Sequence, residues 1–314
     1  MNKPKITIFE AIHHAGFELL SQNCNVEVAY GAPRAEIIER TSTSDAIIVK
    51  SVVKVDRELI DSAPKLKIIA RAGTGLENIH VEYARNQGKK VLSVPTGNTV
   101  SAAEFAIMQM LLLCRRIPEV YRAVSNRDFR RQLLEGRELM AMRVGLIGLG
   151  NVGIEVARRL KAFNPDMIAY DPSSRYADEF QAMGGTMADS LNDLTRVADI
   201  ISLHTVLTPD TSDLVNDQFF EQIKPGLLLI NTARGGVVNE DSVIKALETK
   251  RLSFYATDFM NPEPPFDFPP DAHRFAHPFL THSRVVTTPH LAASTSDAQE
   301  RIAIDLARQI LIAL

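Results

Sequence analysis

The sequence predicts an α/β protein made of two doubly wound parallel-sheet domains. Short runs of β-branched and other apolar residues alternate with segments of helical periodicity along nearly the whole chain, which is typical of parallel strands joined by helical crossovers. The chain has 314 residues, more than one core comfortably supports, so two domains are expected. A glycine-rich turn lies near the middle of the chain, so a substantial unit must precede it.

Strand candidates occur on both sides of that central turn. The five before it are 6–9, 26–28, 46–49, 67–70 and 91–94, and those from the turn onward are 143–147, 168–170, 200–203, 227–230, 253–256 and 285–287. A long helix is expected at 101–116, where apolar residues follow helical spacing after a break at 95–97. The proline-rich segment 261–278 is expected to be an extended loop between two strands.

The central turn has the pattern of a dinucleotide-binding loop, because an apolar strand runs into GxGxxG and then into a helix. Gly148 permits the tight turn, Gly150 lets the backbone approach a pyrophosphate, and Gly153 lets the helix and the strand pack closely. A second apolar run ends in Asp171, about twenty residues on, where a carboxylate can accept a hydrogen bond from a ribose 2′-OH. Such a carboxylate repels a 2′-phosphate, so the pattern predicts NAD rather than NADP.

Three reactive side chains lie in loops that follow predicted strands. Arg234 comes just after 227–230, where open α/β sheets gather ligands, and its guanidinium can hold a carboxylate bidentately. His290 follows the last strand candidate and can transfer a proton. Glu263 lies between two prolines that stiffen its loop, and a carboxylate beside His290 would orient the ring. Taken singly, each side chain also fits an ordinary solvated loop or turn position.

The composition argues against several other classes of protein. The formal net charge is −3 with acidic and basic residues interspersed, so we expect no nucleic-acid partner. Cys24 and Cys114 are far apart, which predicts no disulfide framework and no metal site, and favours a reducing cytoplasmic setting. The apolar run 105–114 is interrupted by Gln109 and is too short to span a bilayer, so no membrane partner is expected.

Several motifs together carry a resemblance to a known family. They are 71–79, 98–104, the glycine loop with Asp171, 203–208, 231–235, 258–264 and 288–295, in that order. On these motifs the chain resembles the D-isomer-specific 2-hydroxyacid dehydrogenases along nearly its whole length. The resemblance implies that Arg234, Glu263 and His290 are the catalytic residues.

The resemblance also implies how the domains and the cofactor site are built. A Rossmann NAD-binding domain, 98–288, is inserted into a flavodoxin-like substrate domain formed by 1–97 and 289–314, with a cleft between them that closes on the substrate. A homodimer is implied through the NAD-binding domain, using the helix 101–116 and an arm to about residue 139. The residues expected to contact NAD are Gly148, Gly150, Asn151, Val152, Gly153, Asp171, Val100, His204, Thr208, Thr232 and Asp258.

Within the family, the sequence is most similar to the 3-phosphoglycerate dehydrogenase branch. The implied reaction is oxidation of D-3-phosphoglycerate to 3-phosphohydroxypyruvate, the first step of serine biosynthesis, with His290 moving the hydroxyl proton while Glu263 stabilises its imidazolium. Lys50, Arg71 and either Arg130 or Arg131 are candidates to bind the phosphate. The residues expected to bind substrate are Lys50, Arg71, Gly73, Thr74, Gly75 and Asn98.

Two other functions stay open. One is a glyoxylate, hydroxypyruvate or other 2-ketoacid reductase, which needs the carboxylate-binding arginine but no phosphate pocket. The other is an NAD-sensing protein resembling the corepressors of the same superfamily, although we find no disordered extensions of the kind those carry. Two features depart from the family pattern, since Val206 stands where proline is usual and the segment 266–283 is longer and more aromatic. The chain stops after its last helix, so serine feedback through a regulatory domain is not expected.

Overall fold

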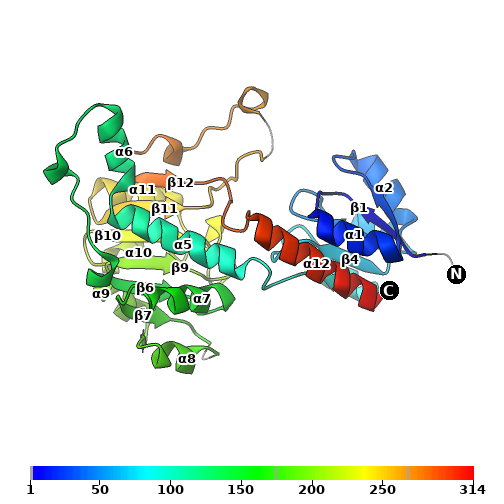
Figure 1. The fold of residues 1–314 in the computed structure, drawn as a ribbon, viewed down its shortest axis with the longest axis horizontal. Coiled ribbons are helices and arrows are strands. Elements are labelled where there is room, and N and C mark those ends of the chain that lie inside the picture. Colours follow the sequence, from blue (N-terminus) through cyan, green and yellow to red (C-terminus); the bar gives the residue numbers. More distant parts are fainter. Residues whose placement is uncertain (1–2, 174, 267–268) are drawn as a thin grey trace. The chain divides into compact units, whose positions relative to one another are not determined.

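The computed structural model describes residues 3–173, 175–266 and 269–314 (Figure 1). Contacts between Cα atoms divide the chain into two compact units. Unit 1 comprises Met1–Thr99 and Ala293–Leu314, and unit 2 comprises Val100–Ala292. The boundaries expected from the sequence, after 97 and after 288, lie a few residues before these.

Unit 1 is built on a five-stranded parallel sheet with strand order β2-β1-β3-β4-β5, the order of flavodoxin-like folds. Its strands are β1 (Lys5–Ile8), β2 (Asn25–Val28), β3 (Ala46–Val49), β4 (Ile68–Arg71) and β5 (Lys90–Leu92). Its helices are α1 (His14–Asn23), α2 (Arg34–Ser42), α3 (Arg57–Asp61), α4 (Val81–Asn86) and α12 (Ser296–Ala313). Every residue of β3 is buried, which explains its continuous apolar sequence, because helices cover both faces of the sheet.

The last helix of the chain returns to pack on this first sheet. Ile302, Leu306 and Ile310 of α12 join the core formed by β1, β3 and β4. The helix also lies against α1 at close range, since a Cβ atom on Gly16 would come within 2.5 Å of the Ala303 carbonyl oxygen. The two ends of the sequence therefore share one hydrophobic core.

Unit 2 is built on a seven-stranded parallel sheet with strand order β12-β11-β10-β9-β6-β7-β8. Its strands are β6 (Arg143–Ile147), β7 (Asp166–Tyr170), β8 (Thr186–Met187), β9 (Ile200–Leu203), β10 (Leu227–Asn231), β11 (Leu252–Thr257) and β12 (Val285–Thr287). The strand order reverses between β6 and β9, and ligands of open α/β sheets bind beyond the carboxyl ends of the strands at such a switch point. The two parallel sheets confirm the predicted α/β class.

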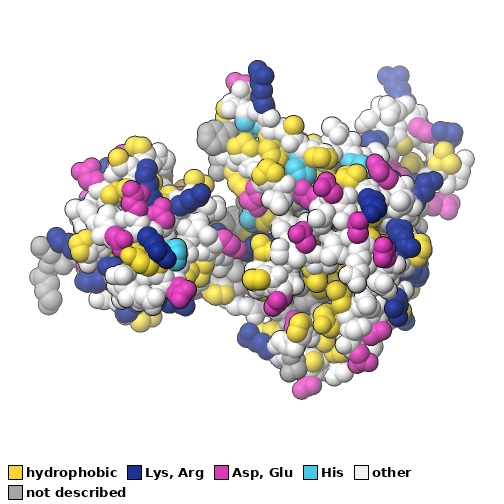
Figure 2. Space-filling view, turned by 180° about the vertical axis from the view of Figure 1, so that it is seen from behind, with side chains coloured by type: hydrophobic (Ala, Val, Ile, Leu, Met, Phe, Trp, Pro, Cys, Tyr) yellow, Lys and Arg dark blue, Asp and Glu magenta, His cyan; other side chains and the backbone are white. Residues whose placement is uncertain are grey.

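Helices cover both faces of the second sheet (Figure 1). They are α5 (Thr99–Cys114), α6 (Ile117–Ser125), α7 (Asn151–Leu160), α8 (Ala177–Ala182), α9 (Leu191–Val197), α10 (Asp217–Gln222) and α11 (Glu240–Glu248). Short 3-10 helices lie at Arg131–Leu133, Leu139–Ala141, Gly235–Val237, Pro270–Ala272 and Pro278–Leu280. In the part of the chain that the structure describes, no helix is both long enough and apolar enough to cross a membrane. Figure 2 shows acidic and basic side chains interspersed over the displayed face of both units.

Candidate active site

The glycine loop joins β6 to α7 at the switch point of the second sheet. Gly148 has φ +97°, and a Cβ atom there would lie 2.8 Å from the backbone of His204. A Cβ atom on Gly153 would lie 2.1 Å from the Gly148 carbonyl oxygen. Gly150 differs, because a Cβ atom built on it meets no described atom within 4 Å. Two of the glycines therefore serve close packing, whereas Gly150 keeps open space in front of the backbone.

The start of α7 is suited to bind a phosphate group. Gly150 is the N-cap residue and has no side chain to occupy the first-turn N–H groups of Asn151, Val152 and Gly153. Those N–H groups have no partner within the helix, and the helix dipole favours an anion beside them. The loop and the helix end thus fit the pyrophosphate of a dinucleotide.

The carboxylate of Asp171 is fixed beside this loop. One oxygen accepts a hydrogen bond from the Leu149 backbone N–H at 2.6 Å, and the other accepts from Ser173 N–H at 2.6 Å. Each carboxylate oxygen can accept more than one hydrogen bond, so both keep capacity for a ribose hydroxyl. A fixed negative charge at this point also disfavours a 2′-phosphate.

Two further residues expected to contact the cofactor hold enclosed polar atoms. In the described residues, both ring nitrogens of His204 and the hydroxyl of Thr232 are buried and have no hydrogen-bond partner. The His204 residue as a whole is partly exposed, but its ring is enclosed. Burial of the ring lowers the pKa of His204 to about 4, so the ring is neutral at pH 7. Buried polar groups without partners are uncommon, and both lie just beyond strands β9 and β10, where a bound dinucleotide could satisfy them.

The other expected cofactor residues lie elsewhere on unit 2. The Thr208 hydroxyl lies 3.1 Å from that of Thr211 and so has a protein partner. Val100 begins unit 2 in the first turn of α5 and is exposed. The Asp258 carboxylate is 1% exposed and turns into the loop that holds His290. Among these, Asp258 contributes most clearly to the geometry of the site.

Asp258 fixes the backbone of the His290 loop. Its carboxylate accepts hydrogen bonds from the Thr288 hydroxyl at 2.6 Å, from Leu291 N–H at 2.8 Å and from Ala292 N–H at 2.7 Å. Burial raises the pKa of Asp258, and these hydrogen bonds oppose that rise. His290 itself has φ +56°, an uncommon left-handed conformation for a residue with a side chain. The surrounding contacts hold His290 in that conformation.

The structure brings His290 and Glu263 into contact. Nδ1 of His290 lies 3.3 Å from Oε1 of Glu263, and the two side chains are 37% and 41% exposed. The His290 ring also packs against Phe259, with ring centroids 4.4 Å apart, and against Phe266 at 6.1 Å. With its Nδ1–H donated to Glu263, the imidazole keeps Nε2 available to exchange a proton with a substrate.

Arg234 contacts Phe259, the aromatic side chain that also packs against His290. Its guanidinium carbon is 5.8 Å from the centroid of the Phe259 ring, a cation–π distance. Asn231 supports the turn, because its amide donates to the Arg234 carbonyl oxygen at 2.9 Å and accepts from Ala233 N–H at 3.0 Å. Phe259 thus contacts both Arg234 and His290. The sequence prediction missed this residue, although an aromatic residue two positions after a buried strand was a visible signal.

The residues expected to bind substrate lie at or beyond the carboxyl ends of β3, β4 and β5 in unit 1. The Lys50 ammonium donates to Gln299 Oε1 at 3.1 Å. The Arg71 side chain lies over Gly73, whose φ is +153°, since a Cβ atom there would be 1.8 Å from Arg71 Nη1. Thr74 and Asn98 are joined by a hydrogen bond of 2.8 Å between their side chains, and Gly75 leaves room for the carboxylate of Glu77. Each residue therefore has a defined local contact in its own unit.

Glu10 organises the loop that begins with Lys50. Its carboxylate accepts four backbone N–H groups, from Lys50 at 2.7 Å, from Ser51 and Val52 at 3.0 Å, and from Val53 at 3.1 Å. Sequence analysis did not identify Glu10, because the two segments are forty residues apart and meet only through the pairing of β1 with β3. The side chain of Arg130, which was expected with Arg131 as an alternative phosphate contact, makes two hydrogen bonds to Asp128.

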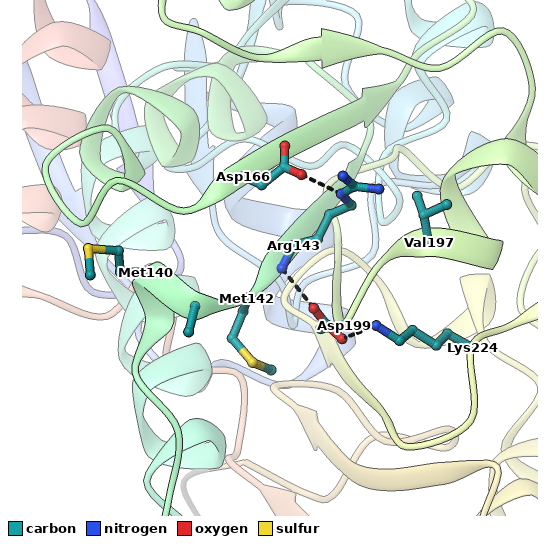
Figure 3. Close-up of a pocket in the computed structure, with 8 residues that line it drawn as sticks. Met140, Met142, Arg143, Asp166, Val197, Asp199 and Lys224 are labelled. Carbon is teal, nitrogen blue, oxygen red and sulfur yellow. Dashed lines mark hydrogen bonds and ion pairs between the residues drawn. The ribbon is translucent and has the colours of Figure 1, made fainter.

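A cavity of about 320 Å³ lies beside the amino ends of β6 and β7, at the end of these strands opposite to the glycine loop (Figure 3). The charges that line it pair with one another, Arg143 with Asp166 at 2.5 Å and Lys224 with Asp199 at 2.6 Å. It is remote from the carboxyl ends of the strands, where open α/β sheets bind ligands. The glycine loop, Arg234 and His290 follow the carboxyl ends of strands of this sheet.

Comparisons with known proteins agree with this geometry. D-3-phosphoglycerate dehydrogenase of Archaeoglobus fulgidus is 38% identical over 309 residues, which cover 98% of this chain and 56% of that protein. The enzyme of the same name from Methanocaldococcus jannaschii is 35% identical over 306 residues, again 98% of this chain and 56% of that protein. The chain therefore spans about half the length of the curated relatives it matches.

A solved structure shares the fold of the whole chain. D-lactate dehydrogenase from Aquifex aeolicus, complexed with NAD and lactic acid, has a TM-score of 0.86 and 25% identity, covering 98% of this chain and 94% of that chain. The family model for the NAD binding domain of D-isomer specific 2-hydroxyacid dehydrogenases matches residues 107–292. That match covers more than half of the sequence and includes the glycine loop, Asp171, Arg234, Glu263 and His290. The chain belongs to the D-isomer specific 2-hydroxyacid dehydrogenase family and carries its NAD-binding domain.

Proposed function

We propose that this protein is an NAD-dependent D-3-phosphoglycerate dehydrogenase, which oxidises D-3-phosphoglycerate to 3-phosphohydroxypyruvate. The observation that carries the proposal is the contact of His290 with Glu263, beside Arg234, in the unit that holds the glycine loop. Support for the substrate comes from the relatives that bear this name and are 35% to 38% identical over nearly all of this chain.

The residues of the site have separate roles in the proposed reaction. NAD, when bound, supplies the acceptor for the hydride that leaves C2 of the substrate. His290 takes the hydroxyl proton on Nε2 during oxidation and returns it during reduction, while Glu263 orients the ring through Nδ1 and stabilises its cationic form. Arg234 holds the substrate carboxylate through its planar guanidinium. The cation–π contact with Phe259 limits the directions in which that guanidinium can point.

The phosphate is assigned to the basic residues of unit 1. Lys50 directly follows β3, and Arg71 is the last residue of the neighbouring parallel strand β4, so both side chains start at the carboxyl ends of these strands. A phosphomonoester carries close to two negative charges and binds best where more than one cation is present. In this proposal the substrate loop is shaped by four residues of unit 1, namely Gly73, Thr74, Gly75 and Asn98.

A reductase acting on unphosphorylated 2-oxo acids is the second candidate. It is favoured by the likeness to the D-lactate dehydrogenase structure, which covers nearly the whole of both chains. Such an enzyme would use the same histidine, glutamate and arginine without a phosphate site.

A kinetic comparison separates the two candidates. NADH oxidation is measured with phosphohydroxypyruvate, hydroxypyruvate, glyoxylate and pyruvate. Highest kcat/KM for phosphohydroxypyruvate supports the phosphoglycerate reaction, whereas preference for one of the other three supports the reductase. Absence of turnover with all four, with NADH still bound, would contradict both candidates and favour a binding protein that senses NAD.

We also propose a cytoplasmic homodimer formed through unit 2. The helix α6 buries none of its residues, and Tyr121 and Phe129 on α6 and the following arm are 71% and 69% exposed. Apolar patches of this kind are typical of protein interfaces. Light scattering should give a dimer for the wild type and a monomer for Tyr121→Asp, with Tyr30→Asp on unit 1 as the control. The free thiols of Cys24 and Cys114 suit a reducing compartment.

A further inference from the structure

The carboxylate of Glu240 joins two points that are distant in the sequence. Glu240 is the first residue of α11, which Asn239 caps by accepting the Ser242 N–H. One Glu240 oxygen accepts the backbone N–H of Asn261 at 2.9 Å, and the other lies 2.9 Å from Nε2 of His277. These two partners bracket the segment 261–277, of which the structure describes 261–266 and 269–277. A single carboxylate therefore ties both ends of that segment to the same helix.

The direction of the hydrogen bond to His277 follows from its other ring nitrogen. Nδ1 of His277 accepts the backbone N–H of Phe279 at 3.2 Å, so it carries no proton. The ring proton is then on Nε2 and is donated to Glu240. The side chains of His277 and Glu240 are only 4% and 19% exposed, so water competes little for this hydrogen bond. The pair forms a directed contact in a mostly enclosed place.

Aromatic packing fixes the His277 ring to the sheet. The ring stacks on Phe275 with an interplanar angle of 12° and meets Phe279 edge-on with centroids 4.9 Å apart. Phe279 in turn packs edge-on against Tyr255, a fully buried residue of β11. Such aromatic pairs restrict both the position and the tilt of a ring. The end of the segment is thereby anchored to the core of unit 2.

The anchored segment carries Glu263, two residues after Asn261. Glu263 is 41% exposed, and its contact with His290 at 3.3 Å depends on where its backbone lies. A loop held at one end samples many conformations, and selecting one of them costs conformational entropy. Fixing both ends removes much of that freedom before substrate binds. The Glu240–His277 pair is thus placed to determine where the Glu263 carboxylate sits.

We infer that Glu240 and His277 are positioning residues for the proposed reaction: together they hold the 261–277 segment so that Glu263 meets Nδ1 of His290. The inference rests on the proposed function, because Glu263 affects turnover only if His290 transfers the proton. Neither residue touches the substrate or the reacting atoms in this scheme.

Steady-state kinetics of His277→Gln test the inference first. A misplacement of about 1 Å can cost on the order of a hundredfold in rate, so we expect kcat with the preferred 2-oxo acid to fall roughly tenfold to a hundredfold. The Kd for NADH should be unchanged. His273→Gln is the matched control, since His273 lies in the same segment and its Nδ1 also accepts a backbone N–H, that of Phe275 at 3.3 Å. Equal loss in both variants would overturn a specific role for His277.

A double-mutant cycle then asks whether the effect passes through Glu263. If it does, His277→Gln should cost little further activity in a Glu263→Gln background, because the contact that it positions has already been weakened. If the fold-losses in kcat of His277→Gln and Glu263→Gln multiply in the double variant, the two residues act independently and the inference is overturned. Glu240→Gln provides a second variant should His277→Gln fold poorly, and it should also lose its effect in the Glu263→Gln background.

A spectroscopic measurement tests the same point without turnover. In the cofactor-free protein, ¹⁵N NMR of labelled histidine reports which ring nitrogen of His290 carries the proton. The wild type should favour the Nδ1–H form, and His277→Gln should shift His290 toward the mixture seen in Glu263→Ala. An unchanged His290 signal in His277→Gln would overturn the inference. If the wild type reduces none of the four 2-oxo acids, the proposed function fails. The NMR measurement still decides whether the Glu240–His277 pair positions Glu263.

Discussion

The Nδ1 atom of His290 lies 3.3 Å from Oε1 of Glu263, and the two residues reach this contact from different segments, Glu263 from the connection that follows β11 and His290 from the loop that follows β12. The contact depends on Asp258, which holds the backbone of the His290 loop. It also depends on Glu240 and His277, which hold the segment on the glutamate side. Two separate sets of hydrogen bonds therefore converge on one pair of side chains.

The first prediction concerns proton transfer. His290→Ala should lower kcat by about two to four orders of magnitude, the range that general acid–base catalysis contributes. The Kd for NADH should stay close to that of the wild type, because His290 lies outside the glycine loop. Turnover is measured by NADH oxidation and the Kd by titration of NADH fluorescence. A parallel loss of turnover and NADH affinity would argue that His290 acts on the cofactor site or on the fold.

The glycines of the dinucleotide loop should separate stability from cofactor binding. A methyl group on Gly150 meets no described atom within 4 Å, so Gly150→Ala should fold with a loss of at most about 1 kcal/mol. The same methyl group fills the space proposed for the pyrophosphate, and NADH affinity should drop sharply. Gly153→Ala should lower both the stability and the NADH affinity, because its Cβ atom would lie 2.1 Å from the Gly148 carbonyl oxygen.

Melting temperature and NADH titration check these two variants together. The result expected is a loss of NADH affinity with little loss of stability in Gly150→Ala, against a loss of both in Gly153→Ala. If Gly150→Ala binds NADH as tightly as the wild type, the open space in front of Gly150 is not where the phosphates lie.

The neutral His204 should make stability depend on pH. Its folded pKa of about 4 is below the ordinary value of 6.5, so between these values the unfolded chain binds the proton that the folded protein excludes. Stability is therefore fully present above pH 6.5 and is lost as the pH falls toward 4. Each pKa unit is worth about 1.4 kcal/mol, which predicts a loss on the order of 3 kcal/mol.

Comparison of melting temperatures from pH 7 to pH 4 measures this effect. The His204→Gln variant cannot titrate in this range, so its melting temperature should fall less than that of the wild type. Parallel curves for the two proteins would show that His204 does not control the acid sensitivity.

Lys50 should distinguish phosphorylated from unphosphorylated substrates. Hydrogen bonds to charged groups contribute about 1.5 to 3 kcal/mol, so Lys50→Ala should raise KM for phosphohydroxypyruvate roughly tenfold to a hundredfold. The KM for hydroxypyruvate should change little. Lys54→Ala, in the same connection between β3 and α3 and exposed to solvent, is the control. An equal rise of KM for both substrates would contradict a phosphate-binding role.

The sequence alone determined the class of the fold and predicted which loops carry the functional side chains. Continuous apolar runs such as 46–49 and 227–230 identified buried parallel strands, because helices cover both faces of such a sheet. The spacing of Gly148, Gly150 and Gly153 identified the dinucleotide loop, since these roles depend on local backbone geometry. The two-residue edge strand β8 was missed, because so short a strand leaves no periodic pattern.

The tertiary structure decided which side chains meet. Nothing local in the sequence pairs Glu10 with the backbone of 50–53, or Glu240 with His277, because these partners are 37 or more residues apart. The Asp258 carboxylate accepts hydrogen bonds from the His290 loop, since β11 and β12 are neighbours in the sheet and bring the two loops together. Strand order is fixed by long-range packing, so it is the sheet topology that selects the partners of each side chain.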